Sequence, residues 1–217
     1  KTMTITKDYL PISMRRSGLK MDKVVFIVCH DVGNPNSSAK GNVKYYHDTK
    51  NDSPTGVHSF IDDKEVIEII PLDEKCNHVR RSVGNDKQLY GVYANDAAIG
   101  VELCYFPQEP ERSKTAYNNY TAYIATLCRN YALDPLQKLV GHYVCDPVRR
   151  TDPLNAFRYL NKSMEQFLQD VKNEMKLDIV LGGDPITPSC WAQEEKIKSL
   201  KVWITNLLTF ISRWYNK

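Results

Sequence analysis

The sequence lacks an apolar run long enough to cross a membrane. Its longest strongly apolar stretch without a charged residue is 202–212, whereas a transmembrane helix needs about 20 apolar residues. Residues 1–22 contain no apolar core of the kind found in secretory signals. We therefore expect a protein without a transmembrane segment that is made in the cytoplasm without a signal peptide. If it acts outside the cell, another factor has to release it.

The sequence also lacks any Cys-x-x-Cys pair. Its six cysteines are widely spaced, and a chain of 217 residues can bury a core without disulfides. Cys29 and Cys104 lie inside apolar, strand-like runs, which predicts small buried side chains. This pattern indicates synthesis in a reducing compartment and excludes a disulfide scaffold.

The sequence also lacks a large excess of either charge. The 29 basic and 26 acidic residues leave a net charge of +3, without the clustered basic face typical of nucleic-acid binding. We expect no nucleic-acid partner. A mild positive charge is compatible with a polyanionic target such as a bacterial wall, but solvated surface lysines and arginines explain it equally well.

What is present indicates an α/β (α+β) fold. Residues 24–29 form a continuous apolar run typical of a central strand, and His30 follows it directly. Residues 57–61 and 65–70 predict a hairpin, and 99–105 alternate as a strand does, with Glu102 on one face. We expect a central mixed β-sheet flanked by helices.

Two stretches show helical spacing of apolar residues. The first predicts a helix around 117–131 and consists of Tyr117, Tyr120, Ile124, Leu127, Cys128 and Tyr131. The second predicts a helix over 157–171 and consists of Phe157, Leu160, Met164, Phe167, Leu168 and Val171. With the strands, they predict one mixed α/β domain over residues 1–178.

The remaining residues, 179–217, predict a linker and one further helix. The glycines and the proline of residues 181–185 (LGGDP) are typical of a linker, and Thr187 followed by Pro188 is typical of a helix start. The helix has an apolar stripe formed by Ile197, Leu200, Ile204, Leu207, Ile211 and Trp214. Such a stripe has to pack on something. We expect it to pack on a second copy of the chain or on a partner, and the alternative is that it completes the core of its own domain.

Three residues form a candidate metal site. His30 ends a buried strand, His142 follows an apolar turn, and Asp152 comes ten residues later. Two imidazoles and one carboxylate are a known catalytic zinc set that leaves one position open. From spacing alone the set is only suggestive, because a single histidine is more often structural. Cys145 is an alternative third ligand.

Several segments in the same order resemble the type 2 N-acetylmuramoyl-L-alanine amidases, a family that includes peptidoglycan recognition proteins and phage endolysins. Residues 141–153 (GHYVCDPVRRTDP) resemble the family's metal-ligand loop, and 26–34 (FIVCHDVGN) its first-ligand strand and loop. Residues 57–63, 70–78 and 95–103 resemble its hairpin, its PLDE segment and the strand that carries its acidic residue. The resemblance covers roughly residues 20–170.

The resemblance implies specific roles. His30, His142 and Asp152 match the ligands of one Zn²⁺ per chain, and Glu102 matches the acidic residue that works on the attacking water. Arg150 matches a basic catalytic position, where the family commonly has lysine. His78 and Asn34 match positions that bind substrate, although the tryptophan usual before His78 is Asn77 here.

The implied function is hydrolysis of the amide between the lactyl group of N-acetylmuramic acid and L-alanine in peptidoglycan, by a phage or prophage endolysin. Two alternatives remain. One is a recognition module that binds peptidoglycan without cutting it, and the other is a cytosolic amidase that recycles muropeptides. The presence of all three ligands and Glu102 counts against the first alternative.

Overall fold

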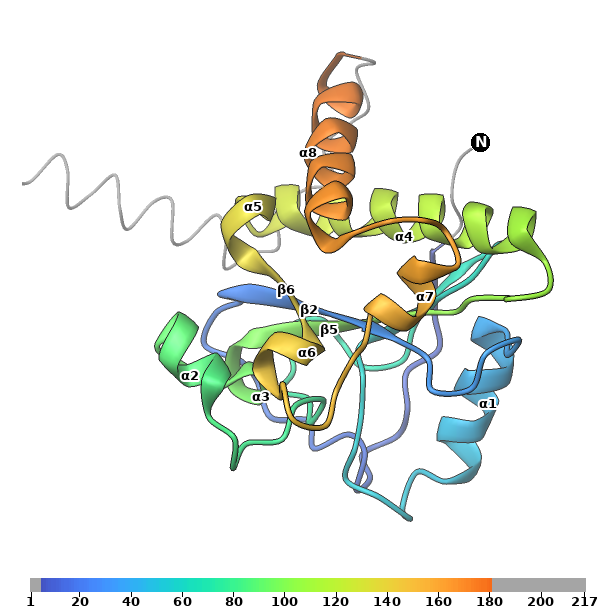
Figure 1. The fold of residues 1–217 in the computed structure, drawn as a ribbon. Coiled ribbons are helices and arrows are strands. Elements are labelled where there is room, and N and C mark those ends of the chain that lie inside the picture. Colours follow the sequence, from blue (N-terminus) through green and yellow to red (C-terminus); the bar gives the residue numbers. More distant parts are fainter. Residues whose placement is uncertain (1–4, 181–217) are drawn as a thin grey trace, which may run out of the picture.

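The computed structural model describes residues 5–180, and its centre is a six-stranded sheet (Figure 1). The strands are β1 (Ile5–Lys7), β2 (Phe26–Asp31), β3 (Ser59–Ile61), β4 (Val66–Glu68), β5 (Ala98–Leu103) and β6 (Leu139–Gly141). Their order is β1-β4-β3-β5-β2-β6, and only β3 and β4 pair in the antiparallel sense. The expected mixed sheet is confirmed, including the hairpin.

Helices lie on both sides of this sheet. They are α1 (Ala39–Asp48), α2 (Asn85–Tyr90), α3 (Ala94–Ala97), α4 (Pro110–Asn130), α5 (Pro135–Lys138), α6 (His142–Cys145), α7 (Leu154–Arg158) and α8 (Met164–Val180). The long helix α4 crosses one face of the sheet, and α8 packs on α4, while α2, α3 and α6 lie on the other side (Figure 1). The expected α/β class therefore holds, with the sheet between two helical layers.

The alternation of side chains along β2 and β5 divides the core into two parts. On the face covered by α4, Ile27 and Cys29 pack in the main apolar cluster together with Tyr120. On the opposite face, Phe26 and Val28 pack in a smaller cluster with Cys145. Successive strand residues point to opposite faces, so His30 shares the face of Phe26 and Val28. The His30 side chain thus lies on the side of the sheet away from α4.

The single helix expected over 157–171 is wrong. The chain forms α7 and then α8, with a break at Asn161, whose φ of 52° lies in the left-handed region. Ser163 starts the second helix: its Oγ accepts from the Gln166 N–H at 3.2 Å, and its own N–H donates to Gln166 Oε1 at 2.8 Å. This reciprocal capping box stops the two helices from merging.

The segment after α8 lies outside the described residues, so the linker and the helix expected over 179–217 stay predictions. Helix α8 itself continues to Val180, past the domain boundary expected at 178. Within residues 5–180, no helix is both long and apolar enough to span a membrane.

A buried ion pair ties the N-terminal segment to the loop after β4. Arg16 contacts Glu74 through two parallel hydrogen bonds, Nε to Oε2 at 2.8 Å and Nη2 to Oε1 at 2.9 Å. The Glu74 side chain is only 5% exposed. The hydrogen bond from Arg16 holds the pKa of Glu74 below its usual value. Burial of the carboxylate acts in the opposite direction, but its effect is smaller. A carboxylate with a lowered pKa stabilises the fold above its unfolded pKa and loses that contribution as the pH falls through the folded one.

We therefore expect Glu74→Gln to lower the free energy of unfolding by about 2 kcal/mol at pH 7, because a charge-assisted bidentate contact is lost. The difference from the wild type should shrink as the pH falls below about 4.5, where the unfolded carboxylate becomes protonated. Urea unfolding across this pH range measures it. The control is Asp48→Asn, because Asp48 pairs with Lys44 at an exposed site and should contribute little. An equal loss in both variants would contradict the argument.

Candidate metal centre

Three adjacent parallel strands deliver the polar side chains of the centre. In the register of the sheet, His30 of β2 pairs with Glu102 of β5, and Cys29 pairs with Gly141 of β6. His142 follows Gly141 and therefore starts at the level of His30. The carboxyl ends of parallel strands meet at one edge of a sheet, where sites in α/β folds gather.

The three expected metal ligands converge. Asp152 Oδ2 lies 2.9 Å from His30 Nδ1 and 3.0 Å from His142 Nδ1, and all three residues are buried. The donor atoms of this set lie within 4.8 Å of one another. The backbone N–H of Tyr143 donates to the Asp152 carbonyl at 3.1 Å, which holds the returning loop against α6. The structure thus brings together residues that are 122 positions apart in the sequence.

The donor set fits a zinc ion. Burial lowers the pKa of His30 to about 4, so this imidazole is neutral at pH 7, as a metal ligand must be. Burial alone would raise the pKa of Asp152, but its close contacts with the His142 and His30 imidazoles hold that pKa below its usual value. Glu102 Oε2 and His142 Nε2 are buried and lack hydrogen-bond partners among the described residues. Two imidazoles, one carboxylate and unsatisfied polar atoms beside them suit a catalytic zinc site.

Cys145, the alternative third ligand, occupies a different place. It packs in the apolar cluster of Phe26 and Val28, and burial raises the pKa of its thiol to about 12. Its sulfur is not among the converging donor atoms that the described residues offer. The geometry favours Asp152.

Glu102 lies at the junction between the metal ligands and a groove of about 510 Å³. Burial first, then the charges of Asp152 and Asp31, raise the pKa of Glu102 well above its usual value. Asn34, expected to contact substrate, lines the same groove. A carboxyl group with a raised pKa in the wall of a groove is suited to accept and return a proton near neutral pH.

The sequence did not identify the other walls of this groove. Tyr45 and Tyr46 of α1 and Phe60 of β3 line it, and the Tyr46 and Phe60 rings lie edge to face with centroids 5.1 Å apart. Helical spacing could place the two tyrosines on a helix, but it could not show that this helix faces Glu102.

Arg150 is exposed on the loop that leads to Asp152. Burial is the main cause of the raised pKa of Glu102 and of the lowered pKa of His30. The charge of Arg150 opposes the first shift slightly and adds slightly to the second. Its neighbour Arg149 forms the ion pair with Asp146, and Arg150 makes none within residues 5–180. A free guanidinium is thereby available to a substrate.

His78 lies behind the metal ligands. It is 6% exposed, its Nδ1 is 3.1 Å from His30 Nε2, and it is absent from the walls of the 510 Å³ groove. Its ring stands edge to face against His30, with centroids 5.3 Å apart. The expected contact of His78 with substrate stays a prediction, and the structure adds a contact between His78 and the expected metal ligand His30.

Asp31 is a further polar residue of the centre that the sequence did not identify. Its carboxylate accepts hydrogen bonds from Asn155 Nδ2 at 3.0 Å and from the Ala156 N–H at 2.9 Å. These bonds fasten the end of β2 to α7, just after Asp152. Its place directly after His30 was the one available signal in the sequence.

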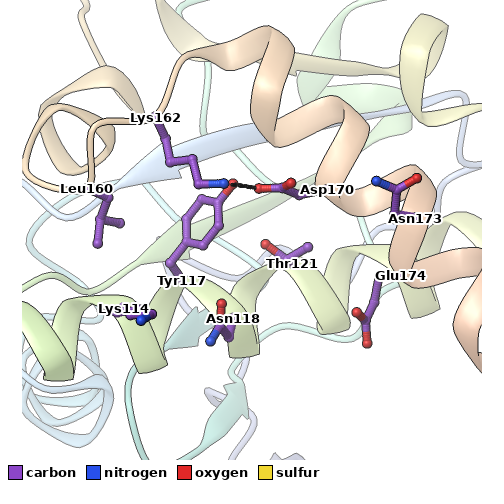
Figure 2. A pocket seen from close by; sticks show the side chains of 9 residues that line it. All are labelled: Lys114, Tyr117, Asn118, Thr121, Leu160, Lys162, Asp170, Asn173 and Glu174. Carbon is purple, nitrogen blue, oxygen red and sulfur yellow. Dashed lines mark hydrogen bonds and ion pairs between the residues drawn. The ribbon is translucent and has the colours of Figure 1, made fainter.

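A second cavity, of about 580 Å³, lies between α4 and α8 (Figure 2). The Tyr117 hydroxyl donates to Asp170 at 2.7 Å, and Lys162 Nζ lies 2.6 Å from the same carboxylate. This cavity shares no lining residue with the metal centre and lies beyond the opposite face of the sheet. Its central charges are already paired with one another, so it does not compete as the functional site.

Comparison with known proteins agrees with this geometry. Residues 20–155 match the model of a family described as N-acetylmuramoyl-L-alanine amidase. The chain is 31% identical over 147 residues to the N-acetylmuramoyl-L-alanine amidase BlyA of Bacillus subtilis (strain 168), covering 64% of this chain and 39% of that protein. It is 29% identical over 143 residues to the amidase CwlL of Bacillus licheniformis, with the same two coverages, 64% and 39%. The chain spans about two fifths of the length of these relatives.

Solved structures share the fold. The hydrolase AmiA of Staphylococcus aureus superposes with a TM-score of 0.66 at 22% identity, over 87% of this chain and 89% of that one. The PlyG catalytic domain superposes with a TM-score of 0.63 at 22% sequence identity, over 80% of this chain and 96% of that one. A protein described as a mutant endolysin from Bacillus subtilis superposes with a TM-score of 0.60 at 22% sequence identity, over 78% of this chain and 99% of that one. At such identities the likeness shows the fold alone.

Proposed function

Since the chain belongs to the N-acetylmuramoyl-L-alanine amidase family, we propose that it hydrolyses the amide between the lactyl group of N-acetylmuramic acid and L-alanine in bacterial peptidoglycan. One observation carries the proposal: His30, His142 and Asp152 converge, and Glu102, which pairs with His30 in the sheet, lines a groove of about 510 Å³.

His30, His142 and Asp152 would hold one zinc ion. When bound, zinc polarises an amide carbonyl and makes water a competent nucleophile near neutral pH. An amide needs this help because its carbonyl is a poor electrophile and its amine a poor leaving group. The burial of the three ligands strengthens these electrostatic interactions, because the effective dielectric constant is lower inside the protein than in bulk water.

Glu102 would move the proton. Its carboxylate takes a proton from the attacking water and gives it to the nitrogen of L-alanine as the amide bond breaks. The raised pKa of Glu102 suits both steps, because a general acid–base works best when its pKa is near the working pH. The register of β2 and β5 fixes this carboxylate next to His30.

Arg150 would face the oxygen of the scissile carbonyl. Negative charge develops on this oxygen as the water adds, and a positioned positive charge stabilises it more in the transition state than in the substrate. Arginine offers a planar fork of donors, where the lysine common in the family offers a point charge. Asn34, with its carbonyl and amide groups, would contact the substrate along the groove.

As the biological setting we propose a phage or prophage endolysin, a proposal that rests on the sequence resemblance and agrees with the fold that the chain shares with a mutant endolysin from Bacillus subtilis. In this setting the enzyme accumulates in the cytoplasm and acts on the wall after release. Wall targeting or self-association through residues 179–217 belongs to the same proposal, and it rests on the sequence pattern alone.

The test is product analysis on purified walls. We expect the zinc-loaded chain to release peptides that begin with a new L-alanine amino terminus, without new reducing sugars, as measured by amino-terminal labelling and mass spectrometry. Binding to walls without any release would instead support the recognition module. Cleavage of soluble muropeptides together with inactivity on intact walls would support the recycling enzyme.

A further inference from the structure

We propose that His78 is a positioning residue that sets the tautomer of His30, so that the His30 Nδ1 lone pair is directed to the metal position. This inference rests on the proposed function, because it concerns the same zinc site. It assigns His78 a role behind the ligand, and not in contact with substrate.

The hydrogen bonds around His78 have only one consistent direction. His78 Nε2 lies 3.2 Å from the Ala98 carbonyl, which can only accept, so Nε2 carries the proton. The Nδ1 of a neutral imidazole is then an acceptor. It lies 3.1 Å from His30 Nε2, so His30 donates there and carries its own proton on Nε2.

This assignment decides what His30 presents to the centre. With Nε2 protonated, Nδ1 of the neutral ring bears a lone pair, and it lies 2.9 Å from Asp152 Oδ2. A lone pair and a carboxylate oxygen repel at this distance unless a cation lies between them. His142 provides a contrast, since its Nε2 has no partner among the described residues. His78 therefore prepares one ligand for a cation before the cation binds.

The strand beneath His78 is shaped for its ring. A Cβ added to Gly100 would lie 2.7 Å from both Cγ and Nδ1 of His78, so only glycine leaves room there. The Gly100 N–H donates to His58 Nδ1 at 3.0 Å, and His58 Nε2 donates to the Glu74 carbonyl at 2.9 Å. His58 and His78 therefore pack on the same glycine from fixed orientations.

The backbone of His78 is held as firmly as its ring. Asn95 Oδ1 accepts from the N–H of His78 at 3.0 Å and from that of Val79 at 2.9 Å, and Asn95 Nδ2 donates to the Val79 carbonyl at 2.8 Å. All of these groups are buried. Gly100 and Asn95 therefore fix both the ring and the backbone of His78, as a residue that orients a neighbouring side chain requires.

The experiment compares three substitutions of His78 in the full chain. In His78→Asn, the side-chain oxygen can occupy the place of Nδ1 and accept from His30. In His78→Gln, the longer amide reaches toward Ala98 and leaves His30 without an acceptor. His78→Leu removes both contacts at similar volume. We expect zinc affinity, measured by competition with a chelating indicator, to fall roughly 10- to 100-fold in the Gln and Leu variants and to be largely retained in Asn.

A second readout needs neither activity nor zinc. Long-range ¹H–¹⁵N spectra of the metal-free wild type should show His30 protonated on Nε2, and this tautomer should be lost in His78→Leu. The matched control is His47→Asn, because His47 pairs with Asp8 far from the centre. It should keep wild-type zinc affinity.

The outcomes separate this inference from the proposed function. If His30 carries its proton on Nδ1, or if His78→Leu binds zinc as tightly as the wild type, the inference is overturned while the zinc site stands. If the wild type binds no zinc, the proposed function fails, and the tautomer of His30 still decides the inference. Gly100→Ala adds an independent variant: it should displace the His78 ring and weaken zinc binding in the same direction.

Discussion

Replacing His142 with alanine is expected to abolish zinc binding and amidase activity together. The substitution removes one of three donor atoms that lie within 4.8 Å of one another and leaves the Asp152 carboxylate with a single imidazole partner. A site with two ligands cannot hold a catalytic zinc ion at ordinary concentrations. The expected loss of activity is therefore complete within the sensitivity of a wall-clearing assay.

Zinc content by mass spectrometry and product release are measured on the same preparation. The control is His47→Ala, which changes a histidine outside the centre and should leave about one zinc per chain. Thermal unfolding of both variants establishes that the loss is not one of folding. Full zinc occupancy in His142→Ala would show that the ligand assignment is incorrect.

Replacing Glu102 with glutamine is expected to keep the zinc and the fold and to lower turnover roughly 10²- to 10⁴-fold. The amide has nearly the shape of the carboxyl group but cannot accept the proton of the attacking water. Glu102 is not among the converging donor atoms, so metal binding should not depend on it. The effect should appear in kcat more than in KM, because proton transfer takes place in the transition state.

Glu111→Gln is the matched control for this variant, since Glu111 is exposed in the first turn of α4, on the other side of the sheet. It should cut walls at the wild-type rate. If Glu102→Gln cut them at a similar rate, Glu102 would be structural, and another group would have to serve as the base.

The sequence by itself determined the parts of the centre that lie within single elements. The apolar run before His30 predicted a buried strand, and β2 is buried along its whole length. The alternation around Glu102 and the hairpin before it were also confirmed. Hydrophobic periodicity reports the burial of each residue along one strand or helix, so inferences of this local kind succeed.

The break at Asn161 shows the limit of periodicity. Apolar residues recur at helical spacing through the break because α7 and α8 pack on the same core, and the pattern therefore reads as one helix. The signal that separates them is Ser163 with Gln166, a local capping pair that is visible in the sequence. The burial pattern concealed a boundary that side-chain hydrogen bonds define.

Only the tertiary structure decided which groups meet across elements. It placed His78 next to His30 and Asp31 against α7, and it brought Tyr45, Tyr46 and Glu102 together in the walls of one groove. These contacts join residues up to 125 positions apart, and no spacing along the chain encodes them. The sequence named the ligand types that can hold zinc. The tertiary structure alone placed His30 Nδ1 next to Asp152 and His30 Nε2 next to His78, because direction is a property of packing.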